Sequence, residues 1–125
     1  MHDDQRDYQI DAECAGGYLR VRAHGTFGLA RTLRLIDFIA AESERHACLK
    51  VLIDVTALAG QPSTIDQFEI ARATAERLRL RRIAVLAATE ALVREGFADM
   101  VAYNRGGQVR SFTIEQQALA WLLGS

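Results

Sequence analysis

The last part of the sequence, residues 109–122, places a short strand pattern directly before an amphipathic helix pattern. Residues 109–113 form the strand pattern, and Thr113 with Gln116 has the spacing of a capping box that begins a helix. The apolar side chains of this helix are Ala118, Leu119, Trp121 and Leu122. A strand followed at once by a helix is the building unit of α/β folds, so this block constrains the fold class most strongly.

The N-terminal half of the chain shows the same change between strand and helix periods. Residues 8–14 and 18–24 alternate apolar and polar side chains around a Gly-Gly pair, which predicts a β-hairpin. Residues 29–46 carry apolar side chains at helical spacing. Residues 48–55 form a near-continuous apolar run, which is typical of a central strand covered on both faces.

A second helix and another buried strand are expected next. Ser63 or Thr64 is expected to cap the helix, and Thr64 with Gln67 has capping-box spacing. The predicted apolar stripe of this helix is Ile65, Phe68, Ala71, Ala75 and Leu78. Residues 82–88 indicate a further buried strand, and Thr89 is expected to begin a third helix that ends before the last strand.

These patterns predict a single α/β domain over residues 1–125. An N-terminal hairpin followed by alternating helices and strands gives a mixed, mostly parallel sheet of five strands with four helices on its faces. A chain of 125 residues that is 50% hydrophobic can bury one compact core.

Composition and charge argue against several classes of protein. The formal net charge of −1 lacks the basic excess of a nucleic-acid-binding protein, so no nucleic acid partner is expected. The Cys and His residues are too few and too far apart for a metal site, and no cofactor motif is present. No apolar run reaches the roughly 20 residues that cross a membrane. Without a leader sequence the chain is expected in the cytoplasm, and without a paired nucleophile and base it is expected not to be an enzyme.

Polar residues gather where the predicted strands end and the helices begin. In a mostly parallel sheet these positions share one edge, where ligands usually bind. The candidate residues for this ligand-binding edge are His24, Thr26, Asp54, Thr56, Ser63, Thr64 and Thr89. The alternative is that the hydroxyls only cap helices or form turns, and that Asp54 hydrogen-bonds the loop amides after it.

Two further features concern the surface. Phe38 falls among charged residues of the first helix, opposite its apolar stripe, so it is a candidate for a homodimer or partner interface. The alternative is an isolated exposed apolar residue, which is common. The segment 76–82 carries the densest positive charge of the chain, which suits binding to an acidic partner or to lipid headgroups. The alternative is that these arginines only complement the dipole at the end of a helix.

The order of the elements and two short blocks resemble the SpoIIAA-like proteins of the STAS superfamily. One block is residues 109–122, with its Phe-Thr pair and its Ala-x-x-Trp-Leu helix. The other is residues 51–55, a strand that ends near an aspartate, Asp54. The resemblance implies strands in sequential order and a binding or regulatory role rather than catalysis. Some SpoIIAA-like proteins also invite comparison with Sec14-type domains, which carry lipids.

The resemblance also implies a position for phosphorylation. STAS proteins that oppose anti-sigma factors carry a phosphorylated serine in an Asp-Ser-Ser-Gly-like segment at the start of the second helix. Ser63 takes that place here. Its neighbours are Pro62, Thr64 and Ile65, so the aspartate and the glycine of the segment are absent.

The predicted function is therefore a non-enzymatic regulatory or protein-interaction role, with either an unknown protein partner or a second copy of the chain in a homodimer. The alternative is binding or carrying a small apolar or amphipathic, lipid-like ligand beneath the first two helices. In that alternative the polar end of the ligand lies at the edge that holds the hydroxyl groups.

Overall fold

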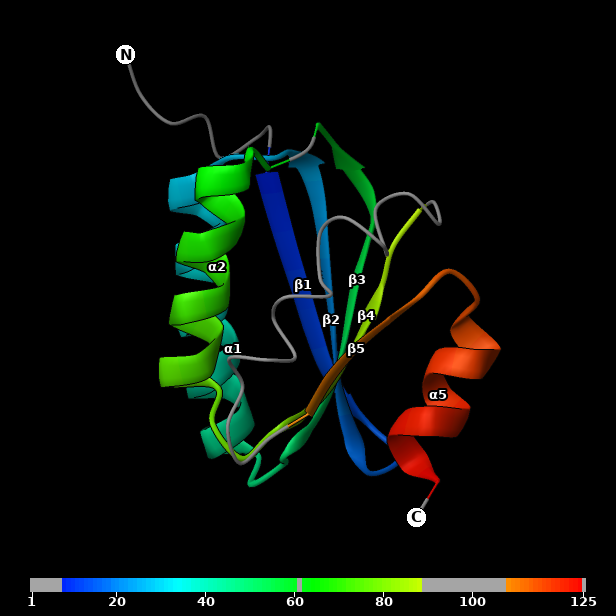
Figure 1. The fold of residues 1–125 in the computed structure, drawn as a ribbon. Coiled ribbons are helices and arrows are strands. Elements are labelled where there is room, and N and C mark those ends of the chain that lie inside the picture. The colour runs from blue at the N-terminus through cyan, green and yellow to red at the C-terminus, as the bar shows by residue number, and fades with distance from the viewer. Residues whose placement is uncertain (1–7, 61, 89–107, 125) are drawn as a thin grey trace.

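The computed structural model describes residues 8–60, 62–88 and 108–124, which form a five-stranded sheet with helices on both faces (Figure 1). The strands are β1 (Tyr8–Ala15), β2 (Tyr18–Thr26), β3 (Lys50–Ala59), β4 (Arg82–Leu86) and β5 (Gln108–Phe112). The helices are α1 (Leu29–Arg45), α2 (Thr64–Arg77) and α5 (Glu115–Leu123). The described residues thus contain three helices rather than the predicted four, and the helix predicted from Thr89 lies outside them.

The strands lie in the sheet in the order in which they follow along the chain, β1-β2-β3-β4-β5. β1 and β2 pair antiparallel, and the other neighbours pair parallel. Gly16 and Gly17 form the hairpin turn with φ angles of 49° and 92°, which residues with a Cβ rarely adopt. The hairpin and the mixed, mostly parallel sheet predicted from the sequence are confirmed.

The two faces of the sheet are covered by different helices. α1 and α2 lie side by side on one face, and α5 lies on the other (Figure 1). Successive side chains of a strand point to opposite faces. In β3, Val51 therefore joins the core beneath α1 and α2, whereas Leu52 joins the smaller core beneath α5.

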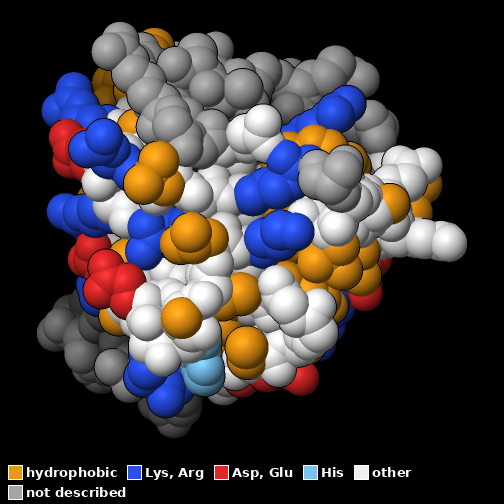
Figure 2. Space-filling model, turned by 90° about the horizontal axis from the view of Figure 1, so that it is seen from below, with side chains coloured by type: hydrophobic (Ala, Val, Ile, Leu, Met, Phe, Trp, Pro, Cys, Tyr) orange, Lys and Arg blue, Asp and Glu red, His pale blue; other side chains and the backbone are white. Residues whose placement is uncertain are grey.

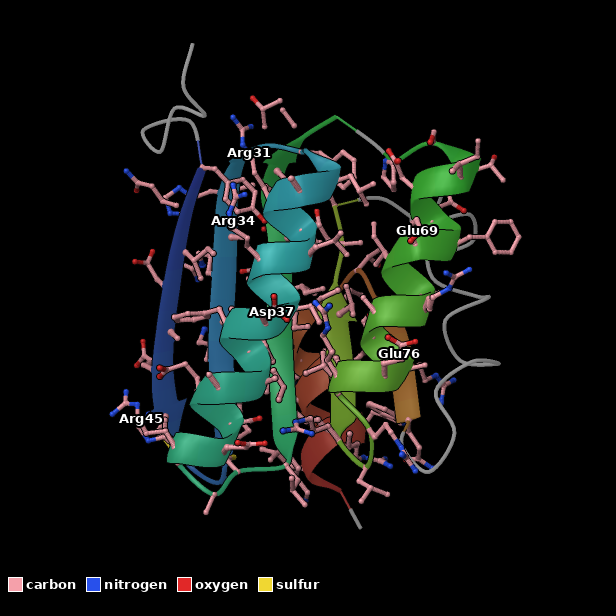
Figure 3. All side chains as sticks on the ribbon, turned by 90° about the vertical axis from the view of Figure 1, so that its left-hand side faces the viewer. Arg31, Arg34, Asp37, Arg45, Glu69 and Glu76 are labelled. Carbon is pink, nitrogen blue, oxygen red and sulfur yellow. The ribbon has the colours of Figure 1, made fainter. Side chains whose placement is uncertain are left out.

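The outer side of the helix pair is charged. Figure 3 shows Arg31, Arg34, Asp37 and Arg45 along α1, with Glu69 and Glu76 along α2. Arg77 Nη1 donates to Asp37 Oδ1 at 2.6 Å, which connects the end of α2 to the middle of α1. The pair therefore presents charge to solvent and apolar side chains to the sheet.

The caps of α2 and α5 confirm the prediction in part. Of the two residues predicted to cap α2, Ser63 is the N-cap: Asp66 N donates to Ser63 Oγ at 3.1 Å, and Ser63 N donates to Asp66 Oδ2 at 3.4 Å. The capping box therefore joins Ser63 and Asp66, and the box predicted for Thr64 and Gln67 is wrong. A reciprocal cap of this kind is worth about 1 kcal/mol. The capping box predicted at the start of α5 is wrong, because the chain stays extended through Ile114, the N-cap residue, which makes no side-chain cap bond.

The buried side of α2 also differs from the predicted stripe. The sequence places Ile65 and Phe68 in the core, but they are 74% and 49% exposed. Ala71 and Leu78 of the predicted stripe are buried, and the helix also buries Ile70 and Thr74, which lie four residues apart on the same side as Leu78. Thr74 tolerates burial because its Oγ1 donates to the Ile70 carbonyl at 2.8 Å, a local bond that a hydrophobic pattern does not reveal.

Candidate functional site

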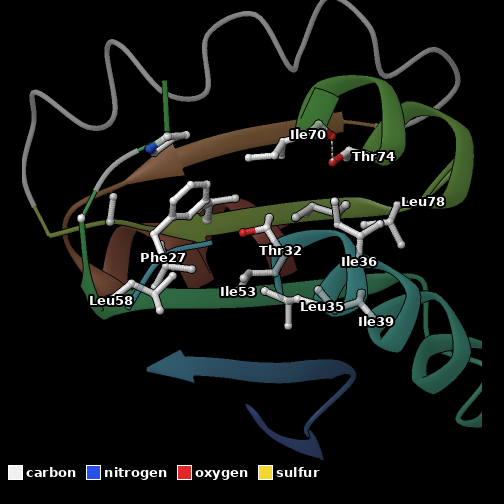
Figure 4. A pocket seen from close by; sticks show the side chains of 16 residues that line it. Phe27, Thr32, Leu35, Ile36, Ile39, Ile53, Leu58, Ile70, Thr74 and Leu78 are labelled. Carbon is white, nitrogen blue, oxygen red and sulfur yellow. Dashed lines mark hydrogen bonds between the residues drawn. The ribbon is translucent and has the colours of Figure 1, made fainter. Parts of the chain in front are cut away.

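An apolar cavity of about 110 Å³ lies between the sheet and the helix pair α1 and α2. Figure 4 shows side chains from both helices and from the strands around it. The apolar walls include Phe27, Leu35, Ile36, Ile53, Ile70 and Leu78. The cavity therefore lies within the larger of the two cores.

Each wall of the cavity follows from the local sequence. Ile36 and Ile39 lie on the sheet side of α1 because residues three apart share a helix face. Ile53 of β3 and Val85 of β4 are paired neighbours in the parallel ladder and point to the same face of the sheet. Ala87 also lines the cavity, and its small side chain leaves space that a larger residue would fill.

Two of the described lining residues, Thr32 and Thr74, carry hydroxyl groups. Thr32 Oγ1 donates to the Gly28 carbonyl at 2.9 Å, and Thr74 Oγ1 donates to the Ile70 carbonyl at 2.8 Å. Each hydroxyl hydrogen is thus used within its own helix, whereas each oxygen still has a lone pair for a donor on a ligand. No charged side chain is among the described lining residues, so an ionic group in the cavity would lack a partner there.

The described residues among those predicted for the ligand-binding edge do not line the cavity. Asp54 follows Leu52 on the sheet face opposite the cavity. Its Oδ1 accepts hydrogen bonds from the amide (2.9 Å) and hydroxyl (2.7 Å) of Thr56, and its Oδ2 accepts one from Arg22 Nε at 3.3 Å. Burial alone would raise the pKa of Asp54, but the hydrogen bonds from Thr56 and the charge of Arg22 hold that pKa below its usual value. Asp54 therefore braces the loop after β3.

His24 and Thr26, at the end of β2, are engaged in local contacts. His24 Nε2 lies 3.3 Å from Asp11 Oδ2 on the neighbouring strand β1. The carbonyl oxygen of Thr26 accepts a hydrogen bond from Arg31 Nη1 at 2.9 Å. Neither residue lines the cavity.

Comparison with known proteins rests on shape rather than on sequence. No protein-family model matches this sequence, and no curated protein matches it significantly. A solved structure does match: an uncharacterised protein of the DUF3478 family from Shewanella loihica PV-4, described as having a SpoIIAA-like fold. The two share 18% sequence identity over 98% of each chain, with a TM-score of 0.57.

This chain has a SpoIIAA-like fold. The fold that the sequence resemblance implied is therefore confirmed. At this level of identity the likeness establishes the fold alone.

Within the SpoIIAA-like fold, Ser63 lies at the start of α2, where the resemblance places a phosphorylated serine. Its hydroxyl accepts the capping bond from Asp66, and the residue is exposed. Thr64, the first residue of the helix, is exposed as well, and Thr89 lies outside the described residues. Phosphorylation of Ser63 stays a prediction.

The sequence interpretation missed two features: the hydroxyl groups of Thr32 and Thr74 in the cavity, and the exposed ring of Phe68. The signal for Thr74 was its position midway between Ile70 and Leu78, each four residues away on the same side of α2. Phe38 is partly buried within the chain, whereas Phe68 is 49% exposed. The interface role of Phe38 stays a prediction.

Among residues 8–60, 62–88 and 108–124, no group of three or more His, Cys, Asp or Glu side chains lies close enough to hold a metal ion. None of the described helices has the length and apolar character needed to span a membrane.

Proposed function

We propose that this protein binds a small, neutral and largely apolar molecule in the cavity beneath α1 and α2, without catalysing a reaction. The observation that supports this proposal is the cavity itself, a space of about 110 Å³ with apolar walls. An apolar ligand that enters it removes apolar surface of both partners from water, which favours binding by about 25 cal/mol per Å².

The volume limits the size of the ligand. In another protein, a cavity of about 150 Å³ lined by Leu, Ile and Phe stays free of water and binds benzene. A cavity of about 110 Å³ therefore suits a compact molecule, such as a small ring or a short branched chain. With six to eight non-hydrogen atoms, such a ligand is expected to bind with a Kd of about 0.1 mM, or about 5.5 kcal/mol.

The polar groups of the cavity limit the chemistry of the ligand. Thr32 and Thr74 offer oxygen acceptors, because their hydrogens are bonded to the helix backbone. A ligand hydroxyl or amine would find an acceptor, whereas a carboxylate would be buried without a partner among the described lining residues. Phenol is therefore expected to bind more tightly than benzene, and benzoate is expected not to bind.

A titration followed by NMR chemical shifts tests the proposal with benzene, phenol and benzoate as probes. Ile36→Phe fills the cavity and is expected to weaken benzene binding at least tenfold. Ile65→Phe is the matched control, because Ile65 is 74% exposed and outside the cavity, and it should bind as the parent does. Failure of both benzene and phenol to bind, or equal binding by Ile36→Phe and the parent, would refute the proposal.

The chemical preference is tested separately with Thr74→Val, which replaces the hydroxyl with a methyl group of similar size. The variant is expected to weaken phenol binding three- to tenfold, about 0.7–1.4 kcal/mol, with benzene binding little changed. An equal change for the two probes would mean that the threonine oxygen accepts no bond from the ligand.

A protein-interaction role is the second candidate. The observation that favours it is the exposure of Ile65 and Phe68, which lie three residues apart on the first turns of α2. If this pair forms an interface with another copy, Phe68→Glu should convert a dimer to a monomer in light scattering, and Phe38→Glu tests the predicted alternative in the same way. An unchanged mass for both variants of a dimeric parent would exclude these positions as the interface.

A further inference from the structure

The lower end of the molecule gathers the last turns of α1, α2 and α5 and the first residues of β3, β4 and β5 (Figure 1). Seen from below, Lys and Arg side chains lie beside hydrophobic ones across this end, with Asp and Glu side chains toward its margins (Figure 2). The most exposed leucines here are Leu80 at 64% and Leu49 at 55% exposure. Their segments adjoin, because Arg82 N donates to the Leu49 carbonyl at 2.8 Å. The lower end therefore exposes apolar side chains beside positive charge.

The loop between α2 and β4 holds Leu80 in an unfavourable conformation. Its φ of 67° is in the left-handed region, which is strained for a residue with a Cβ. The loop is fixed by Arg81, whose buried guanidinium donates from Nε to Ser43 Oγ at 2.9 Å and from Nη1 to the Arg79 carbonyl at 3.0 Å. An exposed leucine on a strained backbone costs stability in the free protein, and such strain is often found at binding surfaces.

Three cations near the leucines, Lys50, Arg79 and Arg82, have no carboxylate partner among the described residues. Lys50 and Arg82 are paired neighbours at the start of β3 and β4. Arg82 lies over the Trp121 ring at 3.9 Å and donates from Nη2 to the Trp121 carbonyl at 2.7 Å. These contacts fix the position of its guanidinium without neutralising its charge.

The acidic groups of this end are fewer and partly paired. Glu42 accepts a hydrogen bond from Arg45 at 2.9 Å, and Glu44 lies 3.9 Å from Arg81. Glu76 lies on the outer side of α2 (Figure 3). Among the described residues around the two leucines, the three cations without a carboxylate partner outnumber Glu76, a carboxylate without a cation partner, so the net unpaired charge is positive, although the whole chain has a formal net charge of −1.

We propose that the lower end docks on an anionic lipid surface. Leu80 and Leu49 insert among the headgroups, and Lys50, Arg79 and Arg82 contact the lipid phosphates. Such a surface is recognised by a few cations and protruding apolar side chains that need no exact spacing. An acidic protein would instead require a broad complementary interface of roughly 800 Å² on each partner. The combination of two protruding leucines with unpaired cations favours the lipid surface.

Sedimentation with vesicles tests this proposal independently of the cavity ligand. The full chain is expected to bind vesicles of phosphatidylcholine with about one third phosphatidylglycerol, to bind phosphatidylcholine alone much less, and to be released by salt. Arg79→Gln should lower the partition coefficient about fivefold, equivalent to about 1 kcal/mol. Leu80→Asn should lower it at least fivefold, and because asparagine tolerates a left-handed backbone, the variant should remain folded.

Two matched variants serve as controls for these changes. Ile65→Asn removes an exposed apolar side chain from the opposite end of α2, and Arg72→Gln removes an exposed arginine from the same helix. Both should bind the anionic vesicles as the parent does. The circular dichroism spectrum and melting temperature of each variant establish that the chain is folded.

Three outcomes would overturn lipid docking. The first is absence of binding to the anionic vesicles, and the second is equal binding to both vesicle compositions. The third is a loss of binding in the control variants as large as in Leu80→Asn and Arg79→Gln. Retention of the chain by immobilised polyglutamate without vesicle binding would assign the basic end to an acidic protein instead.

Discussion

The two faces of the sheet are covered in different ways. On one face, α1 and α2 lie over an apolar core that includes the cavity. On the other, α5 packs mainly on β3, β4 and β5, and the hairpin carries opposite charges at paired positions, Asp11 with Arg22 and Glu13 with Arg20. The extent of helical cover therefore determines which face can hold an apolar ligand and which must remain polar.

The largest difference in stability between the two faces is expected at two neighbouring residues of β2, Leu19 and Arg20. Leu19 is fully buried beneath the helix pair, whereas Arg20 points to the other face and donates to Glu115 at 2.8 Å. Leu19→Ala is expected to lower the free energy of unfolding by about 2–5 kcal/mol. Arg20→Ala should lower it by about 1 kcal/mol or less. Equal losses in urea denaturation at neutral pH would contradict the different roles of the two faces.

The second largest effect is expected at Asp54, the buried carboxylate on the polar face. Asp54→Asn should cost about 1–3 kcal/mol at neutral pH, because it disturbs the bonds from Thr56 and Arg22. The folded protein holds the pKa of Asp54 below that of the unfolded chain. Its contribution is therefore fully present above about pH 4 and is lost as the pH falls through the folded pKa.

Urea denaturation of the parent and Asp54→Asn from neutral to acidic pH checks the sign of this effect. The difference in free energy of unfolding should shrink as the pH falls. A constant difference would show that ionisation of Asp54 makes no contribution.

A smaller effect on stability is expected at the N-terminus of α2, one of the two helices that cover the apolar face. Ser63→Ala removes the reciprocal cap with Asp66 and should cost about 1 kcal/mol. Ser63→Asp retains an acceptor at the N-cap and should cost less. Thr64→Ala is the control, since Thr64 is exposed and does not cap the helix. Thermal unfolding measures these effects. A larger loss of melting temperature in Thr64→Ala than in Ser63→Ala would contradict the assignment of Ser63 as the N-cap.

The smallest effect concerns the attachment of α5 to the other face. Glu115 accepts hydrogen bonds from Arg20 at 2.8 and 3.2 Å, and the pair is partly exposed to solvent. Glu115→Gln should cost about 0.5 kcal/mol at low salt, and the difference should diminish at high salt. A loss of stability that does not depend on salt would indicate that Glu115 stabilises the fold through packing rather than through its charge.

The sequence predicted the architecture well because each element has a local signal. The Gly-Gly pair marks the hairpin, and the apolar run before Asp54 marks the central strand. The choice of Ser63 over Thr64 as N-cap was not resolved, since two adjacent residues can both cap and the chain path decides between them.

The candidate site was predicted less well than the fold. The position beneath the first two helices was named as an alternative, but the edge residues Asp54 and His24 lie away from the cavity. A cavity depends on small differences in spacing between helices and sheet, and a local sequence pattern does not contain those distances. The burial of Thr74 depends on a side-chain bond to its own helix, which hydrophobic periodicity also does not reveal.

The sequential order of the strands has a consequence for synthesis on the ribosome. Each strand pairs with the one made before it, so the sheet can grow outward from the hairpin as the chain emerges, without inserting a strand between two existing neighbours. The core formed by Leu52, Ala84 and Leu86 then remains open until α5 has been made. A nascent chain that stalls before α5 would expose this apolar surface and become a target for chaperones.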